Sequence, residues 1–120
     1  MSASPLPALD AVAVQLAASL QEYESATARM LATWPDLETY RELSGKVEQI
    51  RQYCAVLPQL RIQWAELLIA HAELVHSLWR VGKGEPAVGG QTLEAVRERH
   101  AGCIASTRAR CARVLQQPEA

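Results

Sequence analysis

Three residues of metal-binding types fall on helix-like stripes in the second half of the chain. His100 and Cys103 are three positions apart, so an α-helix presents both side chains on one face. His71 lies on an earlier stripe of apolar residues. Histidine nitrogen and cysteine sulfur are ligands of Zn²⁺, so these types indicate a zinc site or a metal- or thiol-sensing site. The alternative is a polar seam in which the three residues only pack between helices.

A count along the chain brings the two histidines together. The segment Gly82–Gly90 contains four glycines and one proline, which predicts a loop between two antiparallel helices. Counting outward from this loop in both directions places His71 and His100 at the same level, with Cys103 within one turn. The sequence therefore predicts a layer of two imidazoles and one thiol inside the fold.

The cysteines and the start of the sequence bear on the compartment. Three cysteines are too few for a disulfide scaffold and fit a reducing environment. If Pro58 is also a turn, the same count places Cys54 near Cys111, as a redox pair or as small buried side chains. Residues 1–20 lack the cationic start of a secretory signal. No apolar run approaches the ~20 residues of a membrane helix. We therefore expect a cytoplasmic protein with no membrane segment.

Apolar residues recur at spacings of three and four through four segments, which predicts amphipathic helices. The segments cover about 8–33, 36–57, 59–81 and 92–116. The third is the most apolar, and we expect it to be the most buried. Pro58 has two interpretations, because no Gly, Asn or Asp flanks it: a turn, or a kink in one long helix.

These patterns predict an all-α fold. The expected architecture is an antiparallel three- or four-helix bundle, with a Pro-kinked long central helix as the variant. A chain of 120 residues fits one domain. We place that domain at 8–117, after a flexible N-terminal segment at 1–7 and before a short tail at 118–120.

Charge argues against a dedicated nucleic-acid protein. Twelve basic and thirteen acidic residues give a net charge of −1. The basic residues nevertheless gather in the last helix, which leaves a nucleic-acid-associated small subunit as a further alternative. The residues concerned are Arg97, Arg99, Arg108, Arg110 and Arg113. They bracket the inner stripe of that helix, and no aromatic residue interleaves them.

The leading hypothesis is a non-enzymatic protein-interaction module, such as an adaptor, a chaperone-like protein or an assembly subunit. The last helix carries His, Cys and Thr where leucines usually sit, so it should dock weakly and expose an apolar groove. A protein partner or a second copy would occupy that groove. The candidate partner-contacting residues are Trp64, Leu68, Val75, Trp79, Arg97 and Arg108. We find no nucleophile–base pair or paired carboxylates that indicate an enzyme, and no cofactor is implied beyond possible zinc.

Overall fold

The computed structural model describes residues 5–116, with side chains from Leu9 onward. Four α-helices follow one another: α1 (Pro5–Thr33), α2 (Leu37–Cys54), α3 (Arg61–Gly82) and α4 (Leu93–Gln116). Short 3₁₀ turns lie at Pro58–Leu60 and Val88–Gly90. Residues 5–116 contain no β-strand, so the all-α prediction is confirmed. The predicted flexible segment overlaps α1 at residues 5–7, and the rest of it lies outside the described residues, as does the predicted tail.

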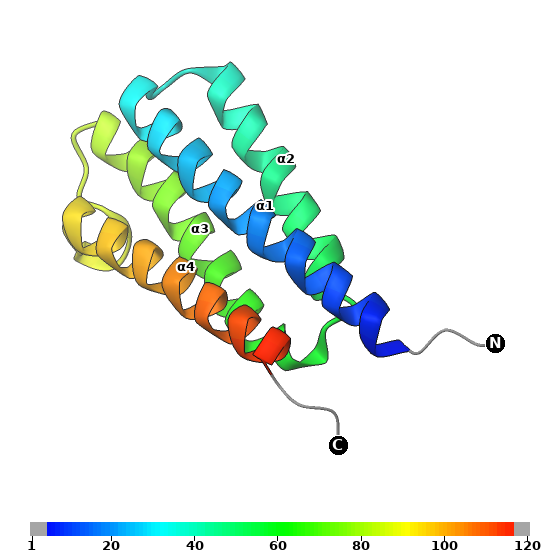
Figure 1. Cartoon of the computed structure of the whole chain (residues 1–120). Helices are drawn as coiled ribbons and strands as arrows, with labels where there is room; N and C mark the ends of the chain where they lie inside the picture. Colours follow the sequence, from blue (N-terminus) through cyan, green and yellow to red (C-terminus); the bar gives the residue numbers. More distant parts are fainter. Residues whose placement is uncertain (1–4, 117–120) are drawn as a thin grey trace.

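The helices alternate in direction and form an elongated four-helix bundle (Figure 1). α1 packs along both α2 and α4, and α4 also packs along α3. α2 and α3 approach each other less closely than the other neighbouring pairs. The four-helix form of the prediction is therefore the observed one, and the three-helix form is wrong.

Pro58 lies in a turn, so the kinked long helix is wrong. α2 ends at Cys54, and Leu57 leaves the helical region with φ −123° and ψ 87°. The ring of a proline disfavours helical geometry in the preceding residue, which is why the break falls there. Pro58 then begins the 3₁₀ turn that leads into α3.

Side-chain caps fix where α2 and α4 begin. The Asp36 carboxylate accepts a hydrogen bond from the Glu38 amide and caps α2. The Thr92 hydroxyl accepts a hydrogen bond from the Ala95 amide and caps α4. Gly89, at φ 68°, belongs to the loop between α3 and α4 and adopts a left-handed conformation that other residues avoid.

The core lies along the inner faces of all four helices. α1 supplies the largest share of its fully buried bulky side chains, namely Leu16, Leu20, Tyr23 and Met30. α3 buries Leu67, Leu74 and Leu78, but other large apolar residues of this helix remain exposed. The expectation that α3 is the most buried helix is therefore wrong. Among residues 5–116, no helix is both long and apolar enough to cross a membrane.

Candidate functional site

The centre of the bundle is polar. The Tyr23 hydroxyl of α1 lies 2.8 Å from Nδ1 of His71 on α3 and 2.6 Å from Nε2 of His100 on α4. The two imidazole centroids are 6.4 Å apart, which confirms that the histidines face each other. Three helices thus meet at one hydrogen-bonded group, which we call the Tyr–His cluster.

Burial keeps the Tyr–His cluster uncharged. It lowers the pKa of His71, and it lowers the pKa of His100 to about 4, with repulsion from His71 adding to the effect. Burial also raises the pKa of Tyr23 above its ordinary value. All three groups are therefore neutral near pH 7, and each imidazole carries a single ring proton.

Sequence reasoning placed the two histidines but missed Tyr23. The tyrosine lies on the apolar stripe of α1, where it is 1% exposed. A buried phenol needs a hydrogen-bond partner, so a tyrosine at an inner position was itself a signal of a polar layer. The cluster is therefore built from His71, His100 and Tyr23, with Cys103 to one side.

A zinc ion held between the two histidines would compete with Tyr23 for their facing nitrogen atoms. Nδ1 of His71 and Nε2 of His100 both engage the Tyr23 hydroxyl. Cys103 is only half-buried, and burial together with the nearby Glu66 carboxylate raises its thiol pKa, which disfavours the ligating thiolate. Within residues 5–116, no three His, Cys, Asp or Glu side chains gather as a metal ion requires. The hydrogen-bonded seam accounts for the two nitrogens without a metal.

A second layer contains the other two cysteines, nearer the end of the bundle where α4 stops. Cys54 and Cys111 are both buried free thiols. Burial and repulsion from Cys111 raise the pKa of Cys54 to about 11. The Cys111 thiol donates a hydrogen bond to the Ala13 carbonyl at 3.1 Å, which ties α4 to α1. Burial also raises the pKa of the Cys111 thiol, so both thiols stay protonated at neutral pH and thiolates are scarce there.

A groove of about 610 Å³ opens between α1 and the first half of α4. We call it the α1–α4 groove. Its lining residues are Glu24, Thr27, Ala28, Leu31, Leu74, Leu93, Glu94, Arg97, Glu98, His100, Ala101 and Ile104. His100 joins this groove to the Tyr–His cluster, because it lines the one and belongs to the other.

The predicted partner-contacting residues divide between two sides of the bundle. Trp64 and Leu68 lie beside α2, where they contact the same small apolar space as Val47 and Ile50. Trp79 stacks edge-on against Trp34, with ring centroids 4.7 Å apart.

The remaining three predicted partner-contacting residues lie in two different places. Val75 packs against the core. Arg97 and Arg108, by contrast, lie on the α1 side of α4. The structure therefore does not bring the six predicted residues into one surface.

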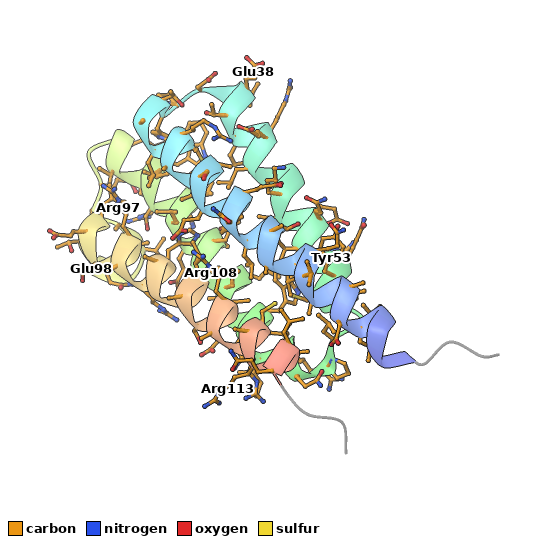
Figure 2. The ribbon with its side chains drawn as sticks, in the orientation of Figure 1. Glu38, Tyr53, Arg97, Glu98, Arg108 and Arg113 are labelled. Carbon is orange, nitrogen blue, oxygen red and sulfur yellow. The ribbon has the colours of Figure 1, made fainter. Side chains whose placement is uncertain are left out.

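The arginines of α4 do not form one ridge either. Arg108 pairs with Glu24 of α1 at 2.9 Å, whereas Arg99 pairs with Glu73 of α3 at 3.3 Å. Arg110 donates a hydrogen bond to the Gln59 carbonyl. Figure 2 shows Arg97 near the start of α4 and Arg113 projecting from its far end. These cations bracket the helix, as the sequence predicted.

Comparisons of this chain with protein-family models, with curated proteins and with solved structures return no match.

Proposed function

We propose that this protein is a non-enzymatic interaction module that binds an amphipathic helix of a protein partner in the α1–α4 groove. The observation that carries the proposal is the groove itself. Its volume of about 610 Å³ lies within the range of specific binding pockets, which is roughly 300–1,000 Å³. It admits several large apolar side chains from one face of a helix.

The floor of the groove consists of apolar side chains and of polar side chains whose hydrogen bonds are already made within the protein. Leu31, Leu74 and Ile104 contribute alkyl surface, and Ala28 and Ala101 leave space above it. The polar side chains of the floor already have partners. Thr27 donates to the Tyr23 carbonyl, and His100 bonds the Tyr23 hydroxyl. What the groove offers a partner is therefore apolar contact, which is the main source of affinity in helix-in-groove recognition.

The rim of the groove selects the charge of the partner. Three glutamates, Glu24, Glu94 and Glu98, face two arginines, Arg97 and the Arg108 that pairs with Glu24, so the rim is net negative. Opposite charge on a partner raises the association rate and disfavours acidic competitors. The occupant that fits is a helix with large apolar residues on one face and Lys or Arg beside them.

The groove is open while α4 remains docked. We expected an apolar surface to appear when α4 swings away, and that opening stays a prediction. The proposal needs no such motion, because α1 and α4 already frame the site. Binding would then involve little rearrangement of the backbone.

Two fluorescent peptides test the proposal. Both are amphipathic helices with leucines at i, i+3, i+4 and i+7, one flanked by lysines and the other by glutamates. We expect the lysine peptide to bind, to shift amide resonances around the α1–α4 groove, and to bind more tightly than the glutamate peptide. No binding of either peptide, or resonance shifts confined to other faces, would contradict the proposal.

Replacing each of two alanines of α4 by tryptophan provides a test variant and its matched control. Ala101→Trp fills the groove with an indole, so affinity for the lysine peptide should fall roughly tenfold or more. Ala95→Trp introduces the same side chain at an exposed position outside the groove, so its affinity should stay unchanged. Circular dichroism establishes that both variants keep the helical fold. Equal binding by Ala101→Trp and the parent chain would remove the groove as the site.

A further inference from the structure

The outward face of α3 is apolar although it faces solvent. A second stripe of residues runs along this helix at spacings of three and four, opposite the buried stripe. Its members are Ile62, Ala65, Ile69, Ala72, His76 and Trp79, and all six are exposed. We call them the outer α3 stripe. Ile62 is 69% exposed, Ile69 53% and Trp79 50%.

Exposure of this kind is unusual for a monomeric bundle. The solvent face of a helix normally carries charged and polar residues. The outer α3 stripe instead carries no Lys, Arg, Asp or Glu, and the two glutamates between Arg61 and Arg80, Glu66 and Glu73, lie to one side of it. Single exposed apolar residues are common, but a continuous apolar stripe marks a surface that another molecule covers.

The stripe has the pattern of a two-stranded coiled coil. Ile62, Ile69 and His76 repeat every seven residues and correspond to the a positions, and Ala65, Ala72 and Trp79 then occupy d. In parallel coiled coils, β-branched residues at a favour two strands over three or four, and the two alanines at d permit close approach of the helices. A single polar residue at a, here His76, fixes the register of such a pair.

We propose that a second copy of this chain covers the outer α3 stripe, with the two α3 helices parallel. The charges beside the stripe favour this arrangement. In a parallel pair, a g residue faces the e residue five positions later on the partner. Arg61 occupies g and Glu66 occupies e, so each Arg61 faces the partner's Glu66. Within the described part of the chain, neither residue forms an ion pair.

The antiparallel alternative places like charges together. Glu66 and Glu73 both lie on the α4 side of the stripe, where Glu73 pairs with Arg99. An antiparallel pair that matches the whole stripe would set Glu66 near the partner's Glu73 and α4 beside the partner's α4. Because α4 carries five arginines against two glutamates, the two copies would repel. The parallel pair sets α4 beside the partner's α2, whose charges balance.

The assembly state tests this surface without involving the α1–α4 groove, since the two share no residue. We expect sedimentation equilibrium to give twice the chain mass of 13.2 kDa. Ile69→Glu should weaken the dimer about a hundredfold or more, because two apolar contacts become two opposed carboxylates. The control Val14→Glu alters a similarly exposed apolar residue of α1, which is 56% exposed, and should leave the dimer intact.

Charge exchange and cross-linking test the orientation. Arg61→Glu should weaken the dimer, and the double variant Arg61→Glu with Glu66→Arg should restore it. Ala65→Cys and Ala72→Cys should each form a disulfide with the same residue of the second copy under mild oxidation, which no antiparallel pair allows for both positions. A monomeric parent chain, a dimeric Ile69→Glu with native helicity, or failure of both cross-links would overturn the proposal.

Discussion

The Tyr23 hydroxyl has one proton, and in the described part of the chain its partners are the two histidines. One imidazole must therefore accept a hydrogen bond from the phenol while the other donates to it. Because both rings are neutral, the tautomer of His71 determines that of His100. The cluster is thus one cooperative unit of three helices, and removal of any member affects the other two.

Tyr23→Phe should lower the free energy of unfolding by about 1–3 kcal/mol. The substitution keeps the ring but leaves nitrogen atoms of His71 and His100 without their partner, and unpaired buried polar groups are destabilising by that amount. Urea denaturation followed by circular dichroism measures the change. The control is Tyr53→Phe, because Tyr53 is only half-buried. Equal stability of Tyr23→Phe and the parent chain would show that the hydrogen bonds contribute nothing net.

Acid should destabilise the protein through the same residues. The unfolded state protonates histidine near pH 6.5, whereas burial and repulsion from His71 hold the pKa of His100 in the folded state at about 4. Stability is therefore full above pH 6.5 and falls as the pH drops from about 6.5 to about 4. One pKa unit corresponds to about 1.4 kcal/mol, so the loss from His100 approaches roughly 3 kcal/mol.

Denaturation curves across that pH range measure the loss. His100→Gln should reduce the pH dependence, since a glutamine does not titrate, and the lowered pKa of His71 accounts for the part that remains. Tyr53→Phe alters a half-buried residue outside the Tyr–His cluster and should retain the pH dependence. A parent chain whose stability is flat between pH 7 and pH 4 would contradict the lowered pKa of His100.

The sequence predicted which residues lie at the same level of the bundle, because that requires only counting positions from a loop. The level of His71 and His100 followed from their distances to the glycine-rich loop, and the rings do face each other. Tyr23 was not recognised as a partner, because a stripe of apolar residues does not show which of its members needs a hydrogen bond. The sequence-based interpretation of His100 as a metal ligand considered His and Cys side chains as its neighbours, but not the tyrosine hydroxyl that the structure places there.

At the scale of the helices, α4 differs from α1 in what it buries. α1 contributes leucines, a methionine and a tyrosine to the core, whereas the inner face of α4 includes His100, Thr107 and Cys111. Thr107 donates its hydroxyl hydrogen to the Cys103 carbonyl of its own helix, so it adds no bond to the rest of the bundle. We therefore expect the free energy that docks α4 to be smaller per residue than that of α1.

Hydrogen exchange should be faster in α4 than in α1. Segments with less apolar burial open at lower free energy, and their amides exchange through those openings. Exchange followed by NMR at neutral pH reads each helix separately, and the inner amides of α1 serve as the slow reference. Protection across residues 93–116 as strong as that of α1 would contradict weak docking of α4.

Helix boundaries were predictable to within a few residues because proline, glycine and capping side chains act locally. The loop at Gly82–Gly90 and the cap at Thr92 were read directly. The exposed fractions of Leu68 and Trp79 were not predictable, since both lie beside the apolar stripe of α3, where the sequence does not show how far a neighbouring helix covers them. Periodicity fixes which residues share a face, but the neighbouring helices decide how much of that face is covered.

For the whole molecule, the bundle presents two apolar surfaces with separate residues. The α1–α4 groove has an acidic rim, and the outer α3 stripe is flanked by Arg61 and Glu66. The bundle was predictable from four amphipathic segments, whereas the location of both surfaces required the packing of one helix against another.

The indole pair at one end of the bundle provides an intrinsic circular-dichroism signal for the conformation of that end. Trp34 follows α1 and Trp79 lies in the last turns of α3, with ring centroids 4.7 Å apart and planes tilted by 71°. Chromophores this close share their excited states, which produces a paired signal in circular dichroism that vanishes when the rings separate. Trp64 stands alone in the second turn of α3 and contributes no such signal. Light absorbed by the unmodified chain therefore reports whether this one end is closed.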